Sequence, residues 1–147
     1  MDEIFKRGTC RHFKELTPVA KEDLLTLVKA GMQARACGNQ EAREAGAAIV
    51  IVGKKENISF PEEWSFDCAA AAENILIEAE HLGLGSIWLQ VYPYADRKAH
   101  LLNILDIPAE MEPFCIIAIG YAERKPVRMN RYNERIIYND LYGSRKK

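Results

Sequence analysis

Two arginines and a threonine near the amino terminus could together bind a phosphate group. They lie in Arg7-Gly8-Thr9-Cys10-Arg11, where the two guanidinium groups are four residues apart and the hydroxyl stands between them. Arginine forms bidentate, charge-assisted hydrogen bonds with phosphate, and threonine adds a further donor. Because surface arginines with this spacing are common, the motif by itself indicates an anion site without establishing one.

The basic residues of the chain are concentrated at its two ends. The net charge of the whole chain is −1, which argues against a general nucleic-acid binder. Residues 124–147 nevertheless carry eight basic and two acidic side chains, and residues 1–14 are also net positive, so the segment between them is acidic. If the fold brings the ends together, they could hold an anion. A solvated basic tail would give the same charge pattern.

The sequence offers little for a metal site or a nucleophile. The four cysteines, which we expect to be free thiols, are Cys10, Cys37, Cys68 and Cys115. They are too widely spaced for a zinc site or a redox CxxC pair. No motif pairs the three histidines with a nucleophilic serine or cysteine. Gly83 and Gly85 follow a predicted helix and open a strand, which is the reverse of the order in a dinucleotide fingerprint.

Composition and length predict one globular domain over residues 1–147, with a basic extension from about residue 124. The chain is 48% hydrophobic and 28% charged, which is typical of globular proteins, and this length supports a hydrophobic core without disulfides. It contains no run of about 18 apolar residues that would indicate a membrane span. The first residues lack the apolar core of a signal peptide, so we expect a cytoplasmic protein.

Hydrophobic periodicity predicts alternating helices and strands around a central sheet. The predicted helices cover residues 2–8, 17–34, 66–82 and 96–105, and the predicted buried strands cover residues 47–52, 84–91 and 114–121. We expect Thr17 to cap the second helix, Ser65 or Asp67 to cap the third, and Gly83 to end the third. Gly53 should end the first strand. The order of elements predicts a three-layer α+β or α/β architecture.

Several segments resemble, in order, those of the FMN-dependent nitroreductase family. The opening RGTCRHF is similar to the R-x-S/T-x-R-x-F element of that family, and the resemblance continues through DLLTLVKAGMQA and AAIVIVG. Its most specific part is DCAAAAENILIEAEHLGLGSIWLQVYPYADR, and it closes with LNILDIPAEMEPFCIIAIGYAERKP and RYNERIIYND. The resemblance therefore covers most of the chain.

The resemblance implies an α+β fold with a mainly antiparallel central sheet flanked by helices, forming a homodimer with FMN at the subunit interface. The family's phosphate-binding positions match Arg7, Thr9, Arg11 and Arg131. The segment containing Trp88, Gln90 and Val91 matches the stretch whose backbone N–H groups face the flavin ring. We expect Gln90 to contribute through its backbone, and we expect the small-residue helix 66–82 to form part of the dimer interface.

The activity implied is that of an NAD(P)H-dependent oxidoreductase. Hydride would pass from NAD(P)H through flavin N5 to a nitroaromatic, a quinone or a related small acceptor by a ping-pong mechanism. The cofactor carries this chemistry, so no side chain is singled out as a catalytic acid or base. Two alternatives are a flavin-binding or catalytically impaired family member, and an unrelated interaction protein with a basic tail.

The sequence departs from the family pattern after Ala34. Family members usually continue with a segment resembling S-x-x-N-x-Q-P-W, then a strand and a further helix. This chain passes from GMQA directly to RACGNQEAREAG, which indicates that about 25–30 residues are absent relative to the family. Because the absent piece normally contacts the flavin and the partner subunit, the shortening could weaken cofactor binding.

Overall fold

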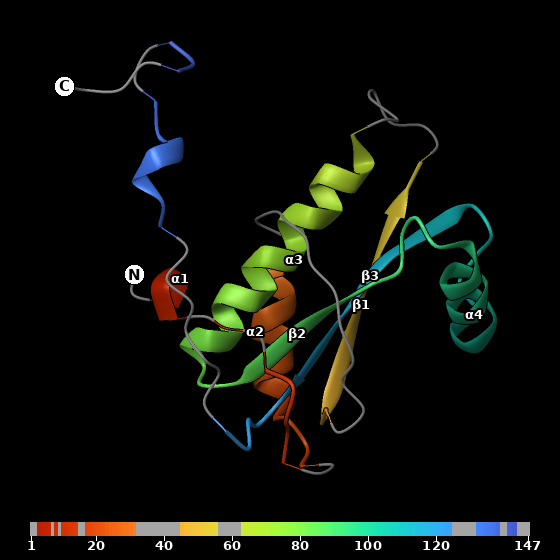
Figure 1. Cartoon of the computed structure of the whole chain (residues 1–147). Helices are drawn as coiled ribbons and strands as arrows, with labels where there is room; N and C mark the ends of the chain where they lie inside the picture. Colours follow the sequence, from red (N-terminus) through yellow and green to blue (C-terminus); the bar gives the residue numbers. More distant parts are fainter. Residues whose placement is uncertain are drawn as a thin grey trace.

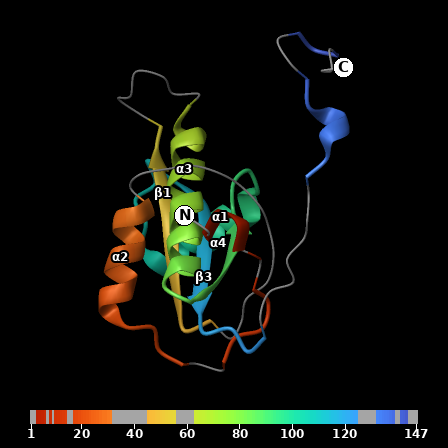
Figure 2. The ribbon, with the colours of Figure 1, turned by 90° about the vertical axis from the view of Figure 1, so that its left-hand side faces the viewer.

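The computed structural model has an α+β fold. It describes residues 3–6, 8, 10–14, 17–31, 45–55, 63–124, 132–138 and 141–143. The elements are α1 (Glu3–Lys6), α2 (Lys21–Gly31), β1 (Ala47–Lys54), α3 (Trp64–His81), β2 (Gly85–Gln90), α4 (Ala95–Leu105), β3 (Met111–Gly120) and the short 3-10 helix η1 (Glu134–Ile136). Helices α2 and α3 lie together on one side of the sheet and α4 lies on the other (Figures 1 and 2), which agrees with the predicted layers.

The three strands form an antiparallel sheet in the order β1-β3-β2. The central strand β3 is buried along almost its whole length, because α3 covers one face and the second apolar cluster, around Phe13 and Ala118, covers the other. The prediction that residues 47–52 are covered on both faces was wrong. β1 is an edge strand of mostly half-buried residues, and Ala48 is exposed.

An irregularity near the start of β3 accommodates a proline in the central strand. Ile51 of β1 pairs with Cys115, but the next residue, Val52, pairs with Pro113. Phe114 is therefore the extra residue of a β-bulge. Proline cannot donate a ladder hydrogen bond and is tolerated in sheets at edges and bulges. The Phe114 carbonyl faces β2, as the alternation of the β2–β3 ladder requires.

The small residues of α3 are used inside the single chain. Ala70, Ala72 and Ala79 are buried, and α3 packs against both α2 and the sheet. At Gly53, an added Cβ would lie 2.3 Å from Trp64 Cε3 at the start of α3, so this glycine permits the close approach of strand and helix. The small-residue surface thus has an explanation without a partner subunit, while Phe66 remains exposed.

Several predicted element ends were wrong by a few residues. Helix α2 begins at Lys21 rather than at Thr17, whose backbone N–H donates to Lys14 O. Glu63 precedes α3 without a side-chain cap, so neither Ser65 nor Asp67 caps it. Strand β1 continues through Gly53 to Lys54. The predicted stop at Gly83 is confirmed: φ is 73° there, and Leu84 N–H donates to Ala79 O, as in a Schellman motif.

Candidate functional site at the outer edge of β2

The amino-terminal segment and the start of the basic tail meet at one corner of the sheet. The backbone N–H of Cys10 donates to Ser86 O of β2 at 3.1 Å, and the N–H of Lys14 donates to Tyr121 O at 2.7 Å. Glu123 N–H donates in turn to His12 O at 2.9 Å. Arg11 is exposed within this segment. The amino-terminal segment thus meets residues 121–123, just before the basic tail, and the convergence of the basic side chains of the two ends stays a prediction.

The outer edge of β2 leads away from this corner. Since Ser86 O accepts the Cys10 N–H, the peptide groups of Ser86, Trp88 and Gln90 point away from β3 in the alternating antiparallel pattern. From Ser86 to Gln90 the strand extends about 13 Å at ~3.3 Å per residue. Gln90 is partly exposed, whereas Trp88 is buried. A ligand beside Arg11 could thus continue along this edge toward Gln90.

The side chain of Trp88 belongs to the core. It packs edge-to-face against Phe114 with ring centroids 5.6 Å apart, and its buried Nε1 has no hydrogen-bond partner among the described residues. Any contribution of Trp88 to a ligand would therefore come from its backbone, as the sequence comparison implied.

The loop after β2, residues 91–94, is fixed by bonds within the chain. The N–H groups of Val91 and Tyr92 both donate to the Phe114 carbonyl, at 3.1 and 2.9 Å, and Tyr94 N–H donates to Val91 O at 2.8 Å. Pro93 has no N–H to offer. The backbone donor expected from Val91 is thus engaged with β3, and Val91 itself is 2% exposed.

Gln90 links this loop to the beginning of α4. Its side-chain Nε2 donates to Tyr92 O at 2.9 Å, and its backbone carbonyl accepts Arg97 Nη1 at 2.7 Å. Arg97 also stacks over the Tyr94 ring, with Cζ 4.5 Å from the centroid. The side-chain amide of Gln90 therefore bonds to the loop, and its outward-facing carbonyl bonds to α4.

The structure brings together only part of the predicted set. Arg11, Trp88, Gln90 and Val91 all lie on or beside β2. Arg7, Thr9 and Arg131 lie outside the described residues. Sequence reasoning missed Arg97 and the bulge at Phe114. For the bulge, Pro113 inside an apolar strand was an available signal.

Thiols and metal ligands add nothing to this site. Cys10, Cys68 and Cys115 are buried thiols. Burial, with a smaller effect of Asp67, raises the pKa of Cys68 to about 11, so its thiol stays protonated. Within the described ranges, no three His, Cys, Asp or Glu side chains are grouped to bind a metal ion, and no helix is long and apolar enough to cross a membrane.

Comparison with known proteins points to one family. The model of the Nitroreductase family matches residues 33–121. A protein of Archaeoglobus fulgidus named as an NADH dehydrogenase/NAD(P)H nitroreductase is 32% identical, over 80% of this chain and 82% of its own. A crystal structure from Parabacteroides distasonis with the same name superposes with a TM-score of 0.85 at 31% identity, covering 96% of this chain and 97% of that one.

Two other solved structures carry FMN in their names. The FMN-dependent nitroreductase of Clostridium difficile R20291 has a TM-score of 0.81 and 25% identity, covering 97% of this chain and all of that one. A structure from Desulfovibrio desulfuricans in complex with FMN shares the fold at a TM-score of 0.76 and 18% identity, covering 96% of each chain.

The comparison also bears on the shortening predicted after Ala34. The match to the Archaeoglobus fulgidus protein has 144 positions, whereas 80% of this 147-residue chain is about 118 residues. About 26 positions of the match therefore have no residue in this chain. That number agrees with the 25–30 residues predicted to be absent. The predicted place of the gap falls among residues 32–44, outside the described residues.

Proposed function

This chain belongs to the nitroreductase family of oxidoreductases, and we propose that it binds FMN along the outer edge of β2 and oxidises NAD(P)H. The proposed electron acceptor is a nitroaromatic, a quinone or a related small molecule. The observation that carries the proposal is the hydrogen bond from Cys10 N–H to Ser86 O. It places the exposed Arg11 at the start of the edge that ends in the partly exposed Gln90.

The described residues suit the two chemically different parts of FMN. Arg11 supplies a guanidinium for the phosphate, and the proposal adds Arg7, Thr9 and Arg131 from outside the described residues. The outward-facing backbone N–H of Gln90 suits the polar edge of a flavin ring, which needs main-chain donors, while the Gln90 carbonyl is bonded to Arg97 Nη1. Of the backbone donors that the resemblance implied, the Val91 N–H is bonded to Phe114 O, so the proposal retains Gln90.

When bound, FMN supplies the redox chemistry, namely hydride transfer from NAD(P)H and then to the acceptor in two half-reactions at one site. The protein's own residues bind, orient and exclude water. The Phe114 carbonyl fixes residues 91–94, so the end of β2 is organised before any ligand arrives. The rings of Trp64, Trp88, Tyr92 and Phe114 pack behind this loop, which keeps water from that side of the site.

The carboxy-terminal segment supports the proposal of a homodimer. Large apolar side chains are exposed there, among them Tyr132 at 71%, Ile136 at 68%, Leu141 at 75% and Tyr142 at 94%. Figures 1 and 2 both show η1 standing apart from the sheet and its helices. Exposed apolar side chains gathered on one segment are typical of protein–protein contacts. We therefore assign the dimer contact primarily to this tail rather than to α3.

The second candidate is a family member that binds flavin but is catalytically impaired. Its support is the absence of about 26 positions relative to the Archaeoglobus fulgidus protein, since the absent family segment was expected to contact the flavin. Family membership sets aside the third alternative, an unrelated interaction protein with a basic tail.

Absorbance of the purified protein, followed by an activity assay, tests these proposals. We expect flavin bands in the protein as purified or after addition of FMN, and oxidation of NADH or NADPH when a nitroaromatic or quinone is supplied. Flavin bands without NAD(P)H oxidation would favour the impaired member. Protein that stays colourless with added FMN would contradict both.

The dimer has its own test. The natural chain should elute as a dimer at micromolar concentration, and the variant Leu141→Ser/Tyr142→Ser should shift toward monomer. A control, Ile104→Ser on α4, replaces another exposed apolar residue and should leave the dimer intact. Elution of the natural protein as a monomer would contradict the proposal.

A further inference from the structure

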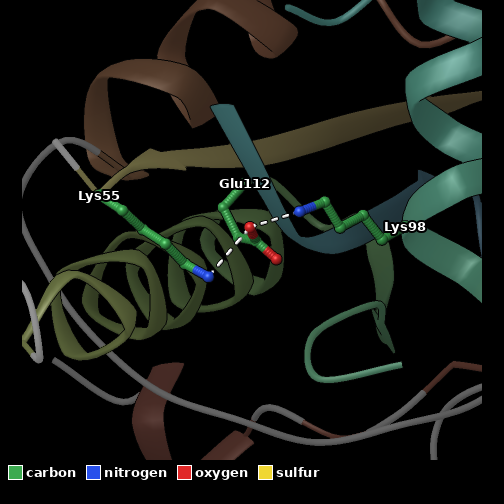
Figure 3. Close-up of polar contacts among 3 residues, drawn as sticks. All are labelled: Lys55, Lys98 and Glu112. Atoms are coloured by element: carbon green, nitrogen blue, oxygen red, sulfur yellow. Dashed lines mark hydrogen bonds and ion pairs between the residues drawn. The ribbon is translucent and has the colours of Figure 1, made fainter. Parts of the chain in front are cut away.

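A buried carboxylate joins three elements behind the loop of residues 91–94. Glu112, near the start of β3, is 8% exposed. Its Oε2 accepts Lys98 Nζ of α4 at 2.7 Å and Lys55 Nζ, just after β1, at 3.0 Å (Figure 3). One oxygen atom therefore links the end of β1, the first turns of α4 and the start of β3.

Both lysines also contact the loop. Lys55 Nζ lies over the rings of Trp64 and Tyr92, 5.2 and 5.6 Å from their centroids, and the Tyr92 ring stacks on Phe114 at 6.3 Å. The backbone N–H of Lys98 donates to Tyr94 O at 3.0 Å. Glu112 thus touches the ring of Tyr92 through one lysine and the carbonyl of Tyr94 through the other.

Maximal stability does not explain such a cluster well. Removing the Glu112 carboxylate from water costs free energy that its pairs with two partly exposed lysines return only in part, and apolar replacements of buried ion pairs are often as stable. What the cluster supplies is a fixed geometry. Glu112 lies two residues before Phe114 in β3, and the Phe114 carbonyl holds the loop by two hydrogen bonds.

We propose that Glu112 is a positioning residue: through Lys55 and Lys98 it holds residues 91–94 in the geometry that receives the ring of the cofactor. This inference rests on the proposed function. It predicts which part of the cofactor will respond to a change at Glu112. The ring lies at the loop, whereas the phosphate lies at Arg11, at the opposite end of β2.

The test compares FMN with riboflavin, which lacks the phosphate, in Glu112→Gln. This variant keeps the shape of the side chain and removes its charge. Affinity for both ligands, measured by flavin fluorescence, should fall by the same factor, about 2- to 30-fold as expected for indirect coupling. Glu110→Gln is the matched control, because Glu110 is an exposed carboxylate two residues away, and it should change neither affinity.

A second variant tests the route through the lysine. Lys98→Met should weaken both ligands in the same way, and the double variant Glu112→Gln/Lys98→Met should lose less than the product of the two single losses, because the residues act as one unit. If the affinity losses of the two single variants multiply in the double variant, or if only FMN binding is weakened, the proposal is overturned.

Hydrogen exchange of the ligand-free protein gives a readout that does not depend on flavin. In Glu112→Gln the amides of Val91 and Tyr92 should exchange faster, while those of Ile87 and Leu89 in the β2–β3 ladder keep their protection. Unchanged exchange at Val91 and Tyr92 would overturn the proposal. If the natural protein binds neither flavin, the proposed function fails, and the exchange rates still decide whether Glu112 holds the loop.

Discussion

At the end of β2, residues 91–94 are fixed by hydrogen bonds and ring contacts within the chain, whereas at the start of β2 the exposed Arg11 stands where two chain segments meet. Both N–H groups of Val91 and Tyr92 share one acceptor, Phe114 O, and Tyr92 also packs against two other rings. The first region is organised by packing. The second depends on charge, so the two should respond differently to mutation, ligand and pH.

The largest effect on stability should follow from removing the Phe114 ring from the packed end of β2, which comprises residues 91–94 and the aromatic rings around them. Its ring contacts Trp64, Trp88 and Tyr92, and it is 4% exposed. Phe114→Ala should lower the free energy of unfolding by about 3–5 kcal/mol, the usual cost of removing a buried aromatic ring. Urea denaturation measures this. A loss below about 1 kcal/mol would mean that the loop is not held by the aromatic packing.

The next largest effect should be on FMN binding and concerns Arg11, at the charged end of β2. Each charge-assisted hydrogen bond to the phosphate should contribute about 1.5–3 kcal/mol, so Arg11→Ala should weaken FMN binding by roughly 10- to 150-fold. Riboflavin should bind the natural protein weakly and hardly respond to the change. Lys14→Ala, an exposed basic residue of the same segment, is the control. Equal losses for both flavins would contradict the assignment of the phosphate to Arg11.

These two regions also differ in how far the sequence predicted them. The apolar runs identified all three strands and the helices between them, because burial imposes a visible period on the sequence. The bulge at Phe114 was missed, since only Pro113 signals it and the pairing partner lies about 60 residues away on β1. The Val91 N–H faces β3 by the ordinary alternation of the β2–β3 ladder, in which Ile87 and Leu89 also point inward. The resemblance implied backbone donors at both Gln90 and Val91, and a choice between them requires knowing which edge of β2 pairs with β3.

The family resemblance predicted Arg11 and β2 as parts of one site, but not how they meet. Arg11 and Ser86 are far apart in sequence, and their proximity depends on the Cys10 backbone bond and the pairing of Phe13 with Ala122. Charge counting indicated only that basic ends could converge. The cluster at Glu112 was invisible for a different reason, because Lys55, Lys98 and Glu112 look like ordinary surface residues in the sequence.

A smaller effect should come from Gly53, beneath the packed end. A Cβ at this position would lie 2.3 Å from the Trp64 ring and 3.0 Å from Cys68 Sγ. Gly53→Ala should destabilise the protein by about 1–3 kcal/mol through overpacking. Thermal unfolding checks this, with Ala48→Gly on the exposed side of the same strand as a control for strand propensity. An unchanged midpoint would show that Trp64 can move aside, and hence that the packed end is softer than its contacts indicate.

The smallest effect should be a dependence of stability on acid pH at Glu112. Burial alone would raise the pKa of this carboxyl, but the hydrogen bonds and charges of Lys98 and Lys55 outweigh it, so the pKa lies below its ordinary value of 4.5. A carboxyl whose pKa is lower in the folded state stabilises that state above its unfolded pKa. This contribution is lost as pH falls through the folded value.

The natural protein should therefore exceed Glu112→Gln in free energy of unfolding at neutral pH, and the difference should shrink progressively below about pH 4.5. Urea denaturation at a series of pH values measures the difference, with Glu110→Gln expected to run parallel to the natural protein. A difference that stays near zero at every pH would mean that Glu112 acts through its shape and not its charge, because glutamine keeps that shape. In that case the positions of Lys55 and Lys98 would have to be set by their own packing, and the packed end of the site would be independent of its ion pairs.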